Sequence, residues 1–271
     1  MANTSSNERP ADVVSPITDA ALPNKLPPAE AIAAGRHGHD KPTPDNCIVL
    51  LIDHQIGLMA GVRDFTSLAE YKSNVVGLAR VAKALNLPVL ISSSNAQYQN
   101  GDTLPEIKEI FADQPIYRRT GIINAYEDPT FRTALEDIVE ATGRRHIIIA
   151  GVTIGTCCTF PTLSLLNDGY NVFPVVDACG AWNRYEAEAA MSRMSRAGAE
   201  VVTTFALACE LQADWKLPTA DAMLEPFIHN LSEYGFVLQN FWNNANQRIV
   251  PDPFGVVKGS SGEDAALILQ E

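Results

Sequence analysis

Cys157 is the residue whose type and position most suggest chemistry in this chain of 271 residues. It follows the apolar run 146–151 and a turn containing Gly155, a pattern that predicts a buried strand, a tight turn and the start of a helix. Backbone N–H groups and the positive end of the helix dipole should stabilise a thiolate there, and the thiolate is the nucleophilic form of cysteine. The alternative is an inert core thiol, because cysteine is often buried. We expect one of Cys157 and its neighbour Cys158 to face the strand-end crevice, and the other to face the core.

Asp53 and Arg119 could supply the other groups that a nucleophilic thiol needs. Asp53 ends the apolar run 47–53, so its carboxylate should be partly desolvated and able to accept a proton near neutral pH. Taken alone, an acidic residue after a buried strand more often caps the next turn. A buried cation from Arg118 or Arg119 would lower the pKa of the thiol and keep the carboxylate ionised, whereas the alternative is a solvated surface pair.

Helical and strand patterns alternate at short intervals along the part of the chain that carries these residues. Such alternation predicts a three-layer α/β/α fold with a mostly parallel sheet of about six strands. Ligands bind such sheets beyond the carboxyl ends of the strands, which is where Asp53, Cys157 and Asp177 fall. The predicted strands are 47–53, 88–93, 113–119, 146–151, 171–177 and 200–204, and the predicted helices are 66–86, 129–142, 157–168 and 185–197.

The sequence predicts one regular domain with a flanking segment on each side. Residues 1–44 are rich in Pro, Ala, Asn and Ser, which indicates an extended N-terminal arm on the surface or on a neighbouring subunit. The regular pattern occupies residues 45–216. Residues 217–271 indicate a C-terminal extension that wraps a neighbouring subunit or is partly disordered.

The composition argues against several classes of function. Apolar residues make up 46% of the chain and charged residues 19%, which is typical of a globular protein. A formal net charge of -12 argues against nucleic acid or an anionic membrane surface as a partner. No apolar stretch approaches a membrane span of roughly 20 residues, and no secretory signal pattern is present, so we expect a cytoplasmic protein. The five cysteines are irregularly spaced without a C-x-x-C pair, which argues against a disulfide framework.

Several separated motifs, in the same order along the chain, resemble those of the isochorismatase-like cysteine hydrolases and most of all the YcaC-like branch of that superfamily. The resemblance extends over about residues 45–216. The segments that carry it are DHQIGL at 53–58, RTGIINAY at 119–126, GVTIGTC at 151–157, VDACG at 176–180, RMSRAGA at 193–199 and CELQADW at 209–215.

The resemblance implies roles for residues of this chain. Cys157 would be the nucleophile, and Asp53 would take the thiol proton and later activate water. Arg119 would occupy the position at which the family commonly has Lys, and it would act electrostatically because Arg cannot carry protons near neutral pH. The resemblance also implies a cis peptide bond between Val152 and Thr153, and an oxyanion hole formed by the backbone N–H groups of Thr153 and Cys157. The residues expected to shape substrate specificity are Gln55, Asn124 and Phe160.

The sequence also departs from some members of the superfamily. Nicotinamidases bind a metal through an Asp-x-His segment and a further histidine after the second strand, but residues 92–98 contain no histidine here. We therefore expect no metal and no cofactor. The side chain of His54 should point away from Asp53 and have a structural or subunit-contact role. The arm, the extension and the ring-forming habit of the branch imply a homo-oligomer, with a ring-type assembly as one form.

These expectations give a leading hypothesis and two alternatives. The leading hypothesis is a metal-free cysteine hydrolase that cleaves a small amide or related C–N bond in a small-molecule substrate through a Cys157 acyl-enzyme. The first alternative is a non-catalytic or redox-responsive oligomer that retains a reactive thiol, since an accessible thiolate is easily oxidised. A nucleotide-binding Rossmann module is the weaker alternative, because no Gly-x-Gly-x-x-Gly follows the first predicted strand.

Overall fold

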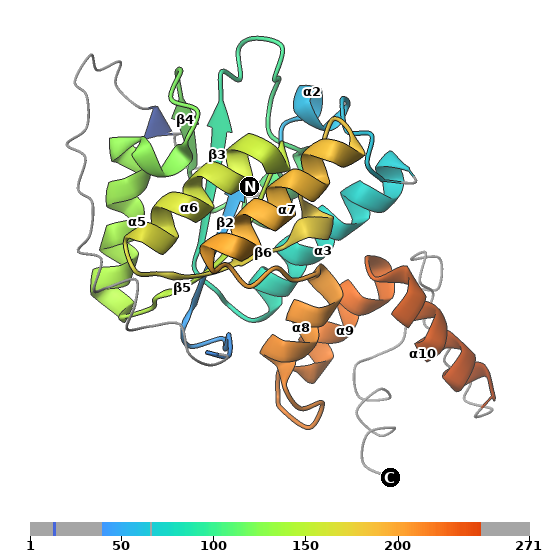
Figure 1. The fold of residues 1–271 in the computed structure, drawn as a ribbon. Helices are drawn as coiled ribbons and strands as arrows, with labels where there is room; N and C mark the ends of the chain where they lie inside the picture. The colour runs from blue at the N-terminus through green and yellow to red at the C-terminus, as the bar shows by residue number, and fades with distance from the viewer. Residues whose placement is uncertain (1–12, 15–39, 66, 245–271) are drawn as a thin grey trace, which may run out of the picture.

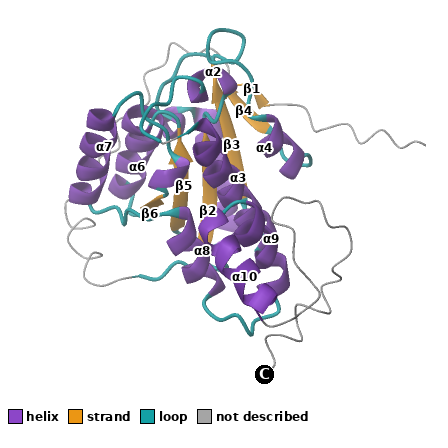
Figure 2. Cartoon of the chain, turned by 90° about the vertical axis from the view of Figure 1, so that its right-hand side faces the viewer, coloured by secondary structure: helices purple, strands orange, loops and turns teal. Residues whose placement is uncertain are grey.

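The computed structural model describes residues 13–14, 40–65 and 67–244, and these form a layered α/β structure (Figure 1). The described strands all run parallel in one sheet with the order β1-β4-β3-β2-β5-β6. Helices α6 and α7 lie on one face of this sheet, and α3 and α9 lie on the other (Figure 2). The predicted three-layer α/β/α fold with a parallel sheet of about six strands is therefore confirmed. The strands are β1 (Val13–Val14), β2 (Cys47–Ile52), β3 (Val89–Ser94), β4 (Ile116–Arg119), β5 (His146–Gly151) and β6 (Asn171–Pro174).

The two central strands explain why the sheet forms where the sequence predicts it. Every residue of β2 and β5 is buried, as expected for parallel strands that are covered by helices on both faces. β2 pairs with β3 on one side and with β5 on the other, and Ile52 at its end is aligned with Gly151. The residues that follow β2 and β5 therefore emerge next to each other at the carboxyl edge of the sheet.

The helices begin and end at residues whose side chains suit those positions. The Asp128 side chain accepts hydrogen bonds from two N–H groups in the first turn of α5, and Pro129 occupies the first helical position. Gly143 ends the helix with a φ of 72°, a left-handed conformation that glycine adopts without steric cost. The α-helices are α2 (Ile56–Met59), α3 (Leu68–Ala84), α4 (Pro105–Ile110), α5 (Pro129–Thr142), α6 (Thr159–Asn167), α7 (Arg184–Ala197), α8 (Thr204–Gln212), α9 (Ala220–His229) and α10 (Ser232–Asn244). The other helical turns are η1 (Ala125–Glu127), η2 (Ile154–Cys158, a π-helical turn) and η3 (Val176–Ala178).

Three predicted elements in the second half of the regular domain differ from the structure. The predicted strand 200–204 is reduced to a single bridge between Val202 and Val175, because the Thr203 side chain caps α8 at that point. The predicted strand 171–177 ends at Pro174, and Asp177 lies in η3. The helix predicted from residue 157 begins at Thr159, after the π-helical turn.

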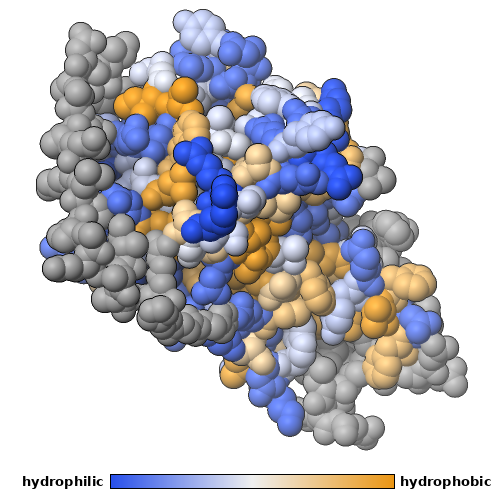
Figure 3. Space-filling view, in the orientation of Figure 1, coloured by the Kyte–Doolittle hydropathy of each residue, from blue (hydrophilic) through white to orange (hydrophobic). Residues whose placement is uncertain are grey.

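The first part of the predicted C-terminal extension packs against the same chain. Helices α9 and α10 follow α8, and the Ser73 hydroxyl on α3 donates to the Asn230 carbonyl at 3.1 Å. Helix α10 also exposes Phe236, Val237 and Phe241, and apolar side chains are visible at the lower right of Figure 3, where α10 lies. The rest of the extension, 245–271, and most of the predicted arm lie outside the described residues. Within the described part of the chain, no helix is long and apolar enough to cross a membrane.

Candidate active site

Asp53 and Arg119 form a buried ion pair at the carboxyl edge of the sheet. Asp53 directly follows β2 with a φ of 57°, and Arg119 is the last residue of β4. Both side chains are fully buried, and the Arg119 Nη2 group donates hydrogen bonds to both carboxylate oxygens of Asp53. The Ser92 hydroxyl donates to Asp53 Oδ1 at 3.2 Å. The adjacent Arg118, in contrast, is partly exposed and contacts the Asp102 carboxylate at 3.5 Å.

The Arg119 guanidinium also donates hydrogen bonds to the backbone of the segment that follows β4. Its Nη1 group donates to the carbonyl of Ile122 and, at 2.8 Å, to the carbonyl of Ile123. Burial alone would lower the pKa of Arg119, but the charge and hydrogen bonds of Asp53 outweigh burial and raise it. Arg119 is therefore a fixed positive charge that joins Asp53 to the backbone of the neighbouring loop.

The predicted nucleophile lies in a turn between β5 and α6. The peptide bond between Val152 and Thr153 is cis, as the family resemblance implied, and η2 follows it. Cys158 is fully buried, whereas Cys157 is only partly buried and interacts with Asp53. The two cysteines thus divide between crevice and core as expected, with Cys157 on the crevice side.

The electrostatics of Cys157 differ from the sequence-based expectation. Burial raises the pKa of the thiol, and the negative charge and hydrogen bond of Asp53 raise it further. The charge of Arg119 and a hydrogen bond from the Thr156 hydroxyl, at 3.6 Å from the sulfur, lower the pKa by less. The net effect is a thiol with a pKa well above its ordinary value. The prediction that this position stabilises the thiolate was therefore wrong, because burial and the charge of Asp53 together outweigh the charge of Arg119.

The three residues expected to shape specificity have internal partners. Gln55 is buried and its amide nitrogen donates to the carbonyls of Ser94 and Gly101, at 3.0 and 2.6 Å. The Asn124 side chain accepts a hydrogen bond from an N–H group of η1 and donates to Ser164 on α6. Phe160 lies on α6 with a guanidinium group over its ring. Their contact with a substrate stays a prediction, as does the oxyanion hole at Thr153 and Cys157.

Two other polar residues at the ends of strands have structural partners. Asp177 accepts hydrogen bonds from the N–H and the hydroxyl of Thr204, at 2.7 and 2.8 Å, where α8 begins. Burial raises the pKa of Asp177. His54 is buried with its Nε2 at 3.0 Å from the Ala178 carbonyl, and burial lowers its pKa to about 4. His54 is therefore a neutral structural residue near pH 7, in line with the expectation.

Sequence reasoning missed two residues that contact this site. Ser92 holds Asp53 from β3, and the parallel pairing of Ile52 with Ser92 could have indicated it. Glu186 at the start of α7 accepts a hydrogen bond from the N–H of Gly155 in the nucleophile turn. The spacing of Asn183 and Glu186 is that of a helix-capping pair, which was the available signal.

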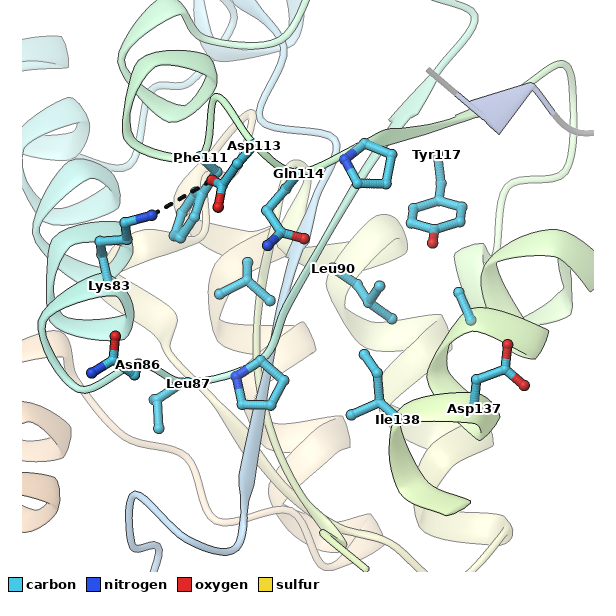
Figure 4. A pocket seen from close by; sticks show the side chains of 14 residues that line it. Lys83, Asn86, Leu87, Leu90, Phe111, Asp113, Gln114, Tyr117, Asp137 and Ile138 are labelled. Atoms are coloured by element: carbon cyan, nitrogen blue, oxygen red, sulfur yellow. Dashed lines mark ion pairs between the residues drawn. The ribbon is translucent and has the colours of Figure 1, made fainter. Parts of the chain in front are cut away.

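The described residues offer little for a second centre of chemistry. Within them, no group of three or more His, Cys, Asp and Glu residues could hold a metal ion. One cavity of about 540 Å³ lies at the opposite, amino end of β3 and β4, between α3 and α5 (Figure 4). Its lining includes Lys83, Leu90, Tyr117 and Ile138 but none of the three predicted catalytic residues.

Comparisons with known proteins support the resemblance. Residues 47–205 match the Isochorismatase domain family. A probable hydrolase from Escherichia coli, YcaC, is 42% identical over 172 residues, which cover 64% of this chain and 80% of that protein. The structure of YcaC from Pseudomonas aeruginosa, solved with hexane-2,5-diol and covalent acrylamide, is 39% identical with a TM-score of 0.69, covering 76% of this chain and 98% of that one. The E. coli YcaC structure, described as an octameric hydrolase of unknown specificity, is 37% identical with a TM-score of 0.71, covering 77% and 99%. The matched domain spans more than half of the chain, and the chain belongs to the isochorismatase family.

Proposed function

We propose that the protein is a cysteine hydrolase that cleaves a small amide or related C–N bond through an acyl-enzyme on Cys157. Asp53 is the base and Arg119 its electrostatic partner. The observation that carries the proposal is the buried ion pair of the Asp53 carboxylate with the Arg119 guanidinium, whose two charges both act on the pKa of the Cys157 thiol. A nucleophile, a base and a group that orients the base are the parts that covalent hydrolysis requires.

In the proposed reaction the thiol is neutral before the substrate binds, because its pKa is raised. As the sulfur bonds to the carbonyl carbon, Asp53 takes the thiol proton, and the N–H groups of Thr153 and Cys157 stabilise the oxyanion. The C–N bond then breaks, and the amine leaves with the proton that Asp53 returns. A water molecule next gives a proton to Asp53 and attacks the thioester, which releases the acid. Asp53 finally returns that proton to the Cys157 sulfur.

Two further observations support this chemistry. Arg119 takes no part in the proton transfers, and its two backbone contacts fix its position through every step. The P. aeruginosa relative was solved with covalent acrylamide, and acrylamide is an electrophile that thiols attack. Acrylamide is therefore a suitable probe of the Cys157 thiol, and YcaC-like hydrolases are the relatives with which activity should be compared.

The test is a screen of small amides for release of ammonia or amine, with Cys157→Ala as the inactive variant. We expect Cys157→Ala to abolish turnover of any substrate found and to leave the circular dichroism spectrum unchanged. Cys209→Ala is the matched control, because Cys209 is also a partly buried free thiol but lies on α8. Turnover that persists in Cys157→Ala would rule out the proposed nucleophile.

A redox-responsive role for the thiol is the second candidate, and the electrostatics favour it less. Oxidation by peroxide proceeds from the thiolate, and burial together with Asp53 raises the pKa of Cys157. A Cys157 thiol that peroxide oxidises faster than Cys209 at pH 7 would reverse this preference.

We also propose that the protein forms a homo-oligomer. The E. coli relative is octameric, and this chain exposes large apolar side chains in the loops and at the first turns of the helices that follow the carboxyl edge of the sheet. Size-exclusion chromatography with light scattering should give a mass several times that of one chain. A monomeric mass at micromolar concentration would refute the proposal. The exposed side chains are Ile56, Tyr98, Ile123, Trp182 and Tyr185.

A further inference from the structure

Glu186 makes an unusual pair of hydrogen bonds at the start of α7. It is the third residue after the N-cap, Asn183, whose side chain accepts a hydrogen bond from the Glu186 N–H at 3.1 Å. In a capping box the glutamate side chain would reach back to the N–H of the N-cap residue itself. Here Oε2 of Glu186 instead accepts from the Trp182 N–H at 2.7 Å, and Oε1 accepts from the Gly155 N–H at 3.3 Å. The carboxylate therefore joins the segment before α7 to the turn that carries Cys157.

The turn approaches Glu186 so closely that a side chain at residue 155 would displace the Glu186 side chain from its present position. A Cβ atom at Gly155 would lie 2.8 Å from Oε1 and 2.9 Å from Cγ of Glu186. The φ of Gly155 is not positive, so its backbone conformation is one that alanine could also adopt. Glycine at this position therefore provides space for the Glu186 carboxylate rather than conformational freedom.

The segment 180–182, which Glu186 joins to the nucleophile turn, is itself held by other hydrogen bonds. The Ala181 N–H donates to Asp64 Oδ1 at 2.9 Å, and the Ala181 carbonyl accepts from the Arg63 N–H at 2.9 Å. The Gly180 carbonyl also accepts from the Ile154 N–H at 2.8 Å. The segment 180–182 is thus held by residues 63 and 64, and Glu186 adds a second link between it and the nucleophile turn beside the Ile154–Gly180 hydrogen bond.

We infer that Glu186 is a positioning residue, which holds the turn 154–158 against the segment 180–182 and thereby sets the place of the Cys157 sulfur relative to Asp53. The consequence for catalysis rests on the proposed function, but the effect on the turn and on the thiol does not. A carboxylate suits this role because it has two acceptor oxygens and both N–H groups need an acceptor. Loss of the carboxylate leaves the part-buried Gly155 N–H without its acceptor in the turn that carries Cys157.

The experiment measures the hydrogen exchange of the turn and the alkylation of the thiol, and neither measurement depends on turnover. Hydrogen–deuterium exchange of a peptide covering 153–158 should be about tenfold faster in Glu186→Ala than in the wild type, because the Gly155 N–H loses its acceptor and the turn loses its attachment to α7. The pH midpoint of Cys157 alkylation by acrylamide should move down towards that of an ordinary thiol, since the released sulfur moves away from Asp53. Glu186→Gln should fall between wild type and Glu186→Ala, because a carboxamide has one acceptor oxygen. Glu188→Ala, on the exposed side of the same helix, is the matched control and should behave as the wild type.

A double-mutant cycle with Gly155→Ala keeps the inference testable even if one variant folds poorly. Gly155→Ala alone should shift the alkylation midpoint, because its methyl group collides with the Glu186 carboxylate. In the Glu186→Ala background the same methyl group meets no carboxylate, so its effect should be at least about threefold smaller. Equal effects in the two backgrounds, or wild-type exchange and midpoint in Glu186→Ala, would overturn the inference. A failed amide screen together with these expected shifts would refute the proposed function and leave the role of Glu186 standing.

Discussion

Replacing Arg119 by methionine tests the buried ion pair on which the candidate site depends. The substitution keeps a long, flexible side chain but removes the positive charge, and it leaves the Asp53 carboxylate buried without its partner. Breaking a buried ion pair by removing one partner costs about 3–5 kcal/mol. The carbonyls of Ile122 and Ile123 also lose their donor, and each adds about 1 kcal/mol or more if the loop does not relax into water. We therefore expect the free energy of unfolding to fall by about 5–7 kcal/mol.

Thermal and urea unfolding, followed by circular dichroism at one protein concentration, measure this loss. For a domain of this size each kcal/mol corresponds to about 2–4 °C in Tm, so Arg119→Met should melt about 10 °C or more below the wild type. The matched control is Arg118→Met, one residue earlier on the same strand. Arg118 is partly exposed and its contact with Asp102 spans 3.5 Å, so its loss should cost less than about 1 kcal/mol.

The double variant Arg119→Met/Asp53→Asn separates the charge from the packing. Replacing both members of a buried pair is often close to neutral, because no unpaired charge remains. The double variant should therefore recover a large part of the stability that Arg119→Met loses. The reasoning fails if Arg119→Met and Arg118→Met unfold alike, or if the double variant is no more stable than Arg119→Met.

Three further predictions concern the thiol, a helix cap and a buried histidine. Asp53→Asn should lower the pH midpoint of Cys157 alkylation, because the Asp53 charge is one cause of the raised thiol pKa; an unchanged or higher midpoint would contradict this. Asp128→Ala should lower the free energy of unfolding by about 1 kcal/mol, since two N–H groups of α5 lose their acceptor, while Asp128→Asn should lose much less in the same urea titration. Burial lowers the pKa of His54 to about 4, so its contribution to stability is fully present above about pH 6.5 and is lost as the pH falls through 4. The wild type should therefore lose up to about 3 kcal/mol of unfolding free energy in this pH range that His54→Phe does not lose. If the unfolding free energy of both proteins falls with the same slope against pH, His54 is not the source of the loss.

The regular part of the fold could be predicted because its signals are local. The apolar run that forms β5 was located to the residue, and Pro129 and Gly143 marked both ends of α5. The false strand at 200–204 shows the limit of such signals. Its two valines favour a strand, whereas Thr203 favours the start of a helix and caps α8. Contacts with the rest of the fold decide which of these two preferences determines the structure of the segment. Local preference cannot decide between them.

The candidate site could be predicted in position but not in its electrostatics. Asp53, Arg119 and Cys157 each stand at the end of a strand or the turn after it, so a parallel sheet brings them to one edge. The sign of the thiol pKa shift, however, depends on burial and on which charge each group meets. The sequence placed a cation beside the carboxylate and the thiol, but it could not show that burial and Asp53 would outweigh that cation at the sulfur.

The pairing of Arg119 with Asp53 gives a physical reason why a non-titrating cation suits the proposed reaction. In the resting site the positive guanidinium and the negative carboxylate compensate each other, and the thiol is neutral. When Asp53 takes the thiol proton, the negative charge passes through the sulfur to the substrate oxygen, so no new charge appears in the buried site. A lysine could lose its proton to the carboxylate in such a desolvated pair, and the base would then be neutralised. Arginine prevents that transfer, which keeps Asp53 available as the proton acceptor.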